Sequence, residues 1–496
     1  MNSKKKIALL ISIVLILSAF SGCNKGSNTS NKGNNTGITD DKNQNEIKNE
    51  TPKDEESDES EKIEENEQKD ESKQGKEVYI NANPLILREG PTSNTKRIGK
   101  ILKSEAVVVE AEITNDTGEV WYKINFDGNE GYISSKYTVD NKFELIPKEY
   151  QDLDYSPQEK IVYEDNKPVK VKGVYVTRFS TVSKNFDYLL DIADKSGINT
   201  FVIDVKDDRG HMLFYSEAAS KIAPKANEGI VLNDIKGFIQ KLKEHNIYTI
   251  ARIVSFKDPI YAEAHPDRAI INRNDGSVFT KSDGLSWVSA YDRQLWDYNV
   301  SVAKEAAIAG FNEIQFDYVR FPASNGGKLD KELDYRNSKN ESKPKAIQEY
   351  LKYAKKELSP HHVYIGADIY GLVASVTNDM SLGQYWEAIS NVVDYVCPMM
   401  YPSHYANGTY DIPIPDANPG DTVYYSTKDS VRRNGNVDTP AIIRPWIQDF
   451  TAPWVKGYIK YGPDELLAQI EALEKNGVDE YLLWNASNKY SYTAVK

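Results

Sequence analysis

Eight short apolar segments alternate with segments of helical periodicity along the C-terminal two-thirds of the chain. Each apolar segment closes on polar or aromatic residues. Strands that alternate with helices are typical of a parallel sheet. Eight such units over about 320 residues predict an α/β fold, a TIM-type (β/α)8 barrel spanning residues 171–496. The predicted strands are 173–179, 201–206, 247–254, 313–322, 363–371, 393–401, 441–448 and 480–486.

The connections between these strands are unequal in length. Three of them, 257–295, 323–343 and 402–439, are long and follow predicted strands. They are therefore expected to build up the face of the barrel at the carboxyl ends of the strands, with 323–343 as a candidate lid. Only residues 487–496 follow the last strand, so the eighth helix is expected to be absent or rudimentary.

Catalytic residues of such barrels lie at the carboxyl ends of the strands. Asp317 closes the fourth predicted strand, where alternation places Gln315, Asp317 and Val319 on one face. A carboxylate among aromatic neighbours is costly to bury unless a partner or a substrate uses it. Either Asp317 is catalytic, or it forms an ion pair with Arg320 or Arg252 that only shapes the rim.

Glycoside hydrolysis is one reaction that uses carboxyl groups in this position. It needs two of them, one on each side of the bond to be broken. Asp368 closes the fifth strand, which neighbours the fourth in a barrel, so Asp368 is the favoured partner of Asp317. Asp204 closes the second strand. Its neighbour Lys206 is expected to keep it ionised, which suits Asp204 to binding sugar hydroxyls. We therefore predict Asp317 as nucleophile and Asp368 as acid/base.

Other strand ends carry hydrogen-bonding groups and indole rings, which suit a sugar site because indole faces stack on the C–H surfaces of sugars. Trp446 and Trp484 are the predicted platforms. Arg444 and Gln448, beside Trp446, are predicted to bind hydroxyls or a carboxylate-bearing sugar. The predicted substrate-binding residues are Asp204, Lys206, Arg252, Arg320, Tyr401, Arg444, Trp446, Gln448, Trp484 and Asn485.

No metal or cofactor is expected. The six histidines are scattered and the chain has two cysteines, so no cluster with the spacing of a zinc site occurs, and a metal-dependent deacetylase is excluded. The sequence has no phosphate-binding glycine loop, and its net charge of −13 argues against a nucleic-acid partner.

The N-terminus predicts export. Three lysines at positions 4–6 precede an apolar stretch over 7–20, which is too short to span a bilayer comfortably, and Ser-Gly-Cys follows at 21–23. This arrangement resembles the signal of bacterial lipoproteins, which implies that 1–22 is removed and Cys23 is lipidated. Attachment to the extracytoplasmic face of the cell membrane would follow. An ordinary cleaved signal peptide is the alternative.

Residues 23–76 are acidic, polar and nearly free of apolar side chains, which predicts a disordered tether. Residues 77–140 then alternate apolar and polar positions, with a turn signal at Asp127-Gly128, and predict a small all-β module. This module resembles the bacterial Src-homology-3-like (SH3-like) family, which implies a role in wall targeting. Residues 141–170 are predicted to be a linker. The segments that carry the resemblance are 87–92, 121–124 and 131–133.

A second resemblance rests on six segments at predicted strands: 173–175, 201–207, 251–254, 315–322, 399–405 and 444–448. Through them residues 171–486 resemble a glycoside hydrolase barrel family of exported bacterial proteins, related to amylase-like and chitinase-like barrels. The resemblance implies a lipid-anchored hydrolase of a cell-wall or extracellular polysaccharide. A surface glycan-binding lipoprotein with a non-catalytic barrel is the alternative. Two departures stand out: the fourth strand lacks the acidic series ending in Glu of chitinase-like barrels, and the fifth offers Asp368 where amylase-like barrels have Glu.

Overall fold

The computed structural model describes residues 75–496. Cys23, the predicted signal 1–22 and nearly all of the predicted tether lie outside the described residues. Within 75–496, no helix is both long and apolar enough to cross a bilayer.

Residues 76–139 form the predicted SH3-like β module, with one sheet in the order β3-β2-β7-β6-β5 and another in the order β4-β1-β8. Alternating side chains such as Val78, Ile80 and Ile133 make its core. The β6–β7 hairpin turns at Asp127-Gly128, both with positive φ (52° and 77°), as the sequence predicts. The strands are β1 (Lys76–Ile80), β2 (Leu85–Arg88), β3 (Arg97–Ile101), β4 (Ala106–Val109), β5 (Ala111–Thr114), β6 (Val120–Phe126), β7 (Asn129–Ser134) and β8 (Thr138–Val139).

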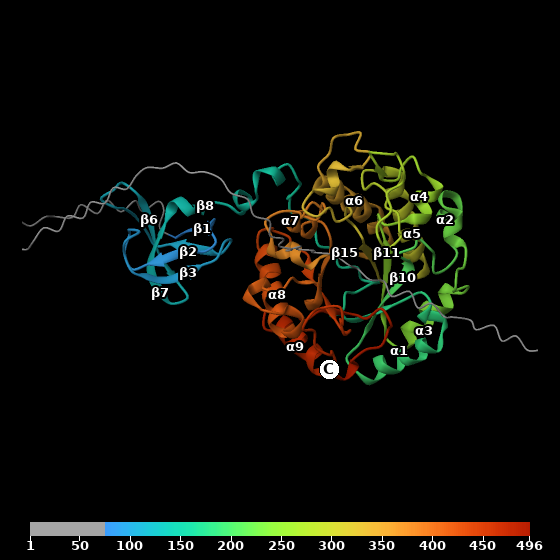
Figure 1. The fold of residues 1–496 in the computed structure, drawn as a ribbon. Helices are drawn as coiled ribbons and strands as arrows, with labels where there is room; N and C mark the ends of the chain where they lie inside the picture. Colours follow the sequence, from blue (N-terminus) through green and yellow to red (C-terminus); the bar gives the residue numbers. More distant parts are fainter. Residues whose placement is uncertain (1–74) are drawn as a thin grey trace, which may run out of the picture. The chain divides into compact units, whose positions relative to one another are not determined.

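Eight parallel strands close into the predicted barrel (Figure 1). The pairing of β15 with β16 completes the circle. The seventh strand is split into β17 and β18 because Pro445, which has no N–H to donate, lies between them. The strands are β9 (Lys172–Val176), β10 (Thr200–Lys206), β11 (Tyr248–Val254), β13 (Glu313–Asp317), β15 (Tyr364–Tyr370), β16 (Tyr395–Met400), β17 (Ile442–Ile443), β18 (Trp446–Gln448) and β19 (Tyr481–Trp484).

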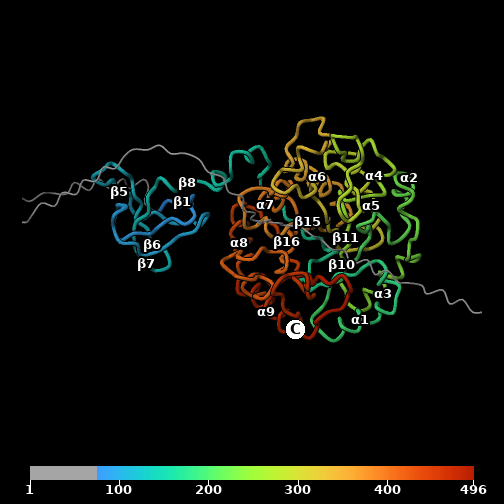
Figure 2. The backbone as a smooth tube through the Cα atoms, viewed as in Figure 1, coloured from blue at the N-terminus to red at the C-terminus, as the bar shows by residue number. Residues whose placement is uncertain are grey.

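Helices surround these strands and bury their apolar faces against the outside of the barrel (Figure 2). After β19, residues 485–496 form the short 3-10 turn Tyr492–Ala494. The helices are α1 (Lys184–Lys195), α2 (Glu217–Ile222), α3 (Ile235–Glu244), α4 (Pro259–Ala264), α5 (Arg293–Ala309), α6 (Lys343–Leu358), α7 (Trp386–Ser390), α8 (Pro419–Asn434) and α9 (Pro463–Glu474).

The long connections are more ordered than the sequence predicts. Residues 402–439 contain α8, whose buried face includes Thr422, Ser426, Thr427 and Ser430. Hydroxyls on this face bond to carbonyls one turn earlier, so the helix packs without the apolar period that would have revealed it. Two short strands connect the other long connections: β12 (Ile271–Asn272) lies in 257–295 and β14 (Leu333–Asp334) in 323–343. Their pairing joins the candidate lid, 323–343, to the connection 257–295.

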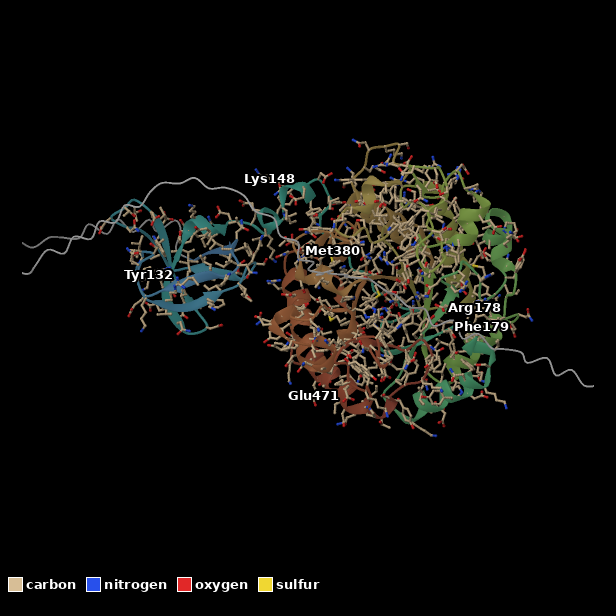
Figure 3. The ribbon with its side chains drawn as sticks, in the orientation of Figure 1. Tyr132, Lys148, Arg178, Phe179, Met380 and Glu471 are labelled. Carbon is tan, nitrogen blue, oxygen red and sulfur yellow. The ribbon has the colours of Figure 1, made fainter. Side chains whose placement is uncertain are left out.

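Much of the predicted linker 141–170 packs against the barrel, and its apolar residues join a small core with α7. Asn166 donates hydrogen bonds to the carbonyls of Asn312 and His362, which lie just before β13 and β15. The basal segment, residues 146–166, which includes Lys148 (Figure 3), contacts the amino ends of β13 and β15 through Asn166. Nearer its start, Tyr150 bonds to Asp379 in the connection that follows β15.

Removing the basal segment is expected to destabilise the barrel. Gln348 exchanges two hydrogen bonds with the backbone of Asp154 (2.8 and 2.7 Å), and Tyr150 stacks on Tyr385 with ring centroids 4.0 Å apart. At about 1 kcal/mol for each of these contacts, a protein that starts at residue 171 should lose about 3 kcal/mol or more of unfolding free energy relative to one that starts at 141. Urea denaturation of both proteins measures the difference, and equal midpoints would contradict this expectation.

Candidate active site

Asp317 and Asp368 come from neighbouring strands, β13 and β15. The strand β13 ends at Asp317 because Tyr318 adopts a left-handed backbone conformation (φ 48°), which turns the chain. Gln315, on the inner face with Asp317, donates from Nε2 to Asp368 Oδ1. The predicted continuation of this face to Val319 is wrong, because past the turn Val319 is buried in the core between strands and helices.

A single arginine connects three carboxylates. Arg252, on β11, is only 1 % exposed. Its Nε and Nη2 donate to Asp317 Oδ2 at 3.0 and 2.5 Å, its Nη1 to Asp204 Oδ1 at 2.6 Å and its Nη2 to Asp208 Oδ1 at 2.9 Å. The ion pair of Asp317 with Arg252, the alternative to a catalytic role, is therefore present. It also fixes the position of the Asp317 carboxylate, and fixed positioning of a reacting group contributes to catalysis.

Asp368 is buried and bound by two side-chain donors. Its Oδ1 accepts from Trp446 Nε1 at 2.7 Å and from Gln315 Nε2, while the residue is only 2 % exposed. Burial, and after it the negative charge of Asp317, raise the pKa of Asp368 well above its usual range. A raised pKa favours the protonated form of the Asp368 carboxyl, which is the form that can donate a proton.

The environment of Asp204 differs from the prediction. Lys206 does not contact it: the Lys206 ammonium is fully buried and donates to Asp258 at 2.8 Å and to Asn299 at 2.6 Å. A register shift in β10 between Asp204 and Lys206 directs the lysine toward α5 in the helix layer. Burial raises the pKa of Asp204 to about 7 despite Arg252, so the expectation that Lys206 keeps Asp204 ionised is wrong.

Four aromatic rings surround the carboxyl groups. Trp484 stacks on Tyr175 at 4.2 Å and 21°, meets Trp446 edge-on at 5.5 Å, and lies 6.3 Å from Tyr401. Trp446 is buried and holds Asp368 through its indole N–H, so it supports the acid and offers little surface to a sugar. Trp484 is half-buried and remains the better platform.

Arg444 lies in the barrel interior at the other end of the strands. Its Nη1 donates to both oxygens of Glu313 and its Nε to Glu480, all at 2.8 Å. Glu313 begins β13 and Asp317 ends it, a separation of about 13 Å along a strand. The structure thus places Arg444 in a buried ion-pair cluster and not beside the catalytic candidates.

Gln448 and Asn485 organise loops. Gln448 is fully buried, and its Oε1 accepts from the backbone N and the hydroxyl of Ser403 at 3.0 and 2.7 Å. Asn485 donates to the carbonyls of Asp449 and Lys489 at 2.6 and 2.7 Å. Both shape the mouth of the barrel by holding the chain that follows β16, β18 and β19.

Sequence reasoning missed three members of this group. Tyr175 donates to Asp204 Oδ2 at 2.5 Å, Gln315 to Asp368, and Asp208 accepts from Arg252. Period-two alternation already places Gln315 on the face of Asp317, and the same alternation on the first strand could have found Tyr175. Within residues 75–496, no three His, Cys, Asp or Glu side chains are arranged to hold a metal ion.

Comparison with known proteins gives two family matches. Residues 173–490 match a family model described as "Putative glycosyl hydrolase domain", and residues 83–139 match one described as "Bacterial SH3 domain". No curated protein matches the sequence.

Among solved structures, the chain is similar to a hypothetical protein from Ruminiclostridium thermocellum (31% identity, 39% of this chain and 96% of that one, TM-score 0.35). It is also similar to the glycoside hydrolase domain of PgaB (BpsB) from Bordetella bronchiseptica (13% identity, 65% and 95%, TM-score 0.46). A variant of the PelA glycoside hydrolase domain from Pseudomonas aeruginosa matches at 12% identity (65% and 97%, TM-score 0.36).

Proposed function

This chain belongs to the family described as putative glycosyl hydrolase domains, and we propose that its barrel hydrolyses a cell-wall or extracellular polysaccharide with Asp317 and Asp368. One observation carries the proposal. Two carboxyl groups from adjacent strands have opposite environments: Asp317 has an arginine counter-charge, whereas burial and the charge of Asp317 raise the pKa of Asp368. Glycoside hydrolysis uses one carboxyl group as proton donor and the other as nucleophile or base, and these two environments suit those two roles.

In the proposed reaction, an oxygen of Asp317 attacks the anomeric carbon while the bond to the leaving oxygen breaks. Asp368 gives its proton to that leaving oxygen. A water molecule then attacks the anomeric carbon of the glycosyl–Asp317 ester, Asp368 takes the proton from the water, and both carboxyl groups return to their starting states. Trp484 supplies an aromatic surface for the sugar, and Arg252 holds the nucleophile.

The alternative is a surface protein whose barrel binds a glycan and does not cleave it. The three ion pairs that Arg252 forms with carboxylates favour this alternative if they are purely structural. Release of reducing ends from a panel of wall and matrix polysaccharides distinguishes the two. Retention of a glycan without cleavage would contradict the hydrolase.

The rate should fall at alkaline pH. Because Asp368 has a raised pKa, it is protonated below that pKa and loses its acid function as pH rises through it, so kcat/KM should decline on the alkaline side above the usual range of a carboxyl group. Asp204 has a pKa of about 7 and is the control. In the Asp204→Asn protein, kcat/KM should still decline on the alkaline side of the pH profile. If that decline disappears, Asp204 is the acid.

We further propose that Cys23 carries a lipid that attaches the protein to the extracytoplasmic face of the membrane, with the SH3-like module retaining it near the wall. The motif Ser21-Gly22-Cys23 after a short apolar stretch supports this location. Cys23→Ala should move the protein from the membrane fraction to the soluble fraction, whereas Cys397→Ala should not. Membrane association of the Cys23→Ala protein would count against lipidation.

A further inference from the structure

An arginine without a carboxylate partner among residues 75–496 lies just past the end of β13, three residues after Asp317. Arg320 is 6 % exposed, and its guanidinium lies over the rings of Trp287 (4.9 Å), Tyr318 (5.2 Å) and Tyr370 (5.6 Å). Its one hydrogen bond runs from Nη1 to the carbonyl of Phe321 at 3.0 Å. Among the ion pairs of residues 75–496, none involves Arg320, which leaves most of its five N–H donors for another partner.

Two lysines lie in the same region. Lys257 is buried, pairs with Asp283 at 2.9 Å and lies over the Tyr318 ring at 4.6 Å. Lys281 forms no ion pair in the described part of the chain, and burial followed by the charge of Arg320 lowers its pKa to about 8. Among the described residues, Arg320, Lys257 and Lys281 thus have one ion-pair partner between them, Asp283.

The position of this cation cluster, Arg320, Lys281 and Lys257, relates it to the catalytic carboxyls. Tyr318 follows Asp317 directly, and Tyr370 lies two residues after Asp368 on β15. Both rings contact the Arg320 guanidinium, so the cluster lies at the mouth of the barrel on the β13–β15 side.

None of the active-site carboxylates is bonded to Arg320. Asp317, Asp204 and Asp208 all bond to Arg252, and no bond joins any of them to Arg320. Holding a guanidinium at 6 % exposure without a counter-ion is unfavourable unless an anion completes the site.

We propose that the cation cluster binds an anionic substituent of the glycan, so that the substrate is an acidic polysaccharide. The planar guanidinium of Arg320 suits the two oxygens of a carboxylate or a phosphate, and Lys281 adds a second charge. This inference rests on the proposed function and narrows its substrate class.

Paired probes test the inference in the full-length protein carrying Asp368→Asn, so that bound glycan is not cleaved. The carboxylate arm compares oligogalacturonates with their carboxyl-reduced neutral products. The phosphate arm compares a phosphomannan with the same mannan after dephosphorylation. In at least one arm the charged form should bind more tightly by about 10-fold or more, since hydrogen bonds to a charged group are worth about 1.5–3 kcal/mol.

Substitutions assign that preference to the cluster. Arg320→Gln should reduce the preference by about 10-fold or more. Lys281→Gln, in a half-buried loop position, should reduce the preference for the charged glycan by a smaller factor. This variant provides the test if Arg320→Gln does not fold. Arg273→Gln, which removes the same charge from an exposed position of the barrel domain, should leave the preference unchanged.

Equal binding of charged and neutral forms in both arms would overturn the inference, as would a preference that survives both Arg320→Gln and Lys281→Gln. If the Asp368→Asn protein binds neither member of either pair, the inference is also overturned. Release of reducing ends from a neutral glycan by the wild-type protein would then show that the hydrolase proposal stands without it.

Discussion

Asp368→Asn should lose about 10²- to 10⁴-fold in turnover of an unactivated polysaccharide, the usual contribution of a positioned general acid. The loss in kcat/KM, which reports the first step, should be far smaller on an aryl glycoside whose phenol is a strong acid, because that leaving group departs without being protonated. Asparagine can still accept the Trp446 and Gln315 hydrogen bonds through its carbonyl oxygen, so the fold should be retained. Initial rates on the two substrate types measure the effect.

Asp449→Asn is the matched control for this substitution. Asp449 is also buried in the barrel domain, burial raises its pKa to about 6, and its Oδ2 accepts from the Ser491 backbone at 2.7 Å. It has no bond to Asp317 or Asp368, so its variant should turn over both substrates at near wild-type rates. An equal loss on both substrates in Asp368→Asn would remove Asp368 from the acid role.

Arg444→Met should destabilise the protein by about 3–5 kcal/mol, because it leaves charges buried without their partner. Arg444 is 0 % exposed and bridges Glu313 and Glu480. Since Arg444 lies at the opposite end of the barrel from Asp317, KM for a glycan should change little at a temperature where the variant is folded. Chemical denaturation and steady-state kinetics on the same preparation separate these two effects.

Two further variants sharpen the Arg444 test. Arg336→Met, at an exposed position in a loop of the same domain, should change stability by less than about 0.5 kcal/mol. Glu313→Gln combined with Arg444→Met should recover part of the loss, because one uncompensated carboxylate is then neutral. A raised KM with unchanged stability in Arg444→Met would restore the predicted sugar-binding role.

The sequence predicts the barrel well because each strand is an apolar segment that ends on polar residues. It fails where packing does not use apolar side chains, as on the buried Thr and Ser face of α8. Lys206 shows a second limit: a one-residue register shift reverses the side of the sheet on which a side chain lies, and alternation alone does not reveal it.

The sequence predicts only some of the residues that line the candidate site. Alternation indicates that Arg444 and Trp446 face the same side of the sheet, yet it does not indicate depth along the barrel. Pro445 splits the strand, and Arg444 joins Glu313 at one end while Trp446 joins Asp368 nearer the other. Tertiary ion pairs such as those of Arg252 join residues from three strand ends, so their partners become clear only once the strands are assembled.

Trapping the glycosyl-enzyme tests the central claim most directly. A 2-deoxy-2-fluoro glycoside with a good leaving group slows the second step more than the first, so the intermediate accumulates on the nucleophile. Mass spectrometry of the digested protein should find the sugar on the peptide that contains Asp317, and Asp317→Asn should carry none. A label on another carboxylate, or cleavage with inversion and no label, would contradict the assignment of Asp317 as nucleophile.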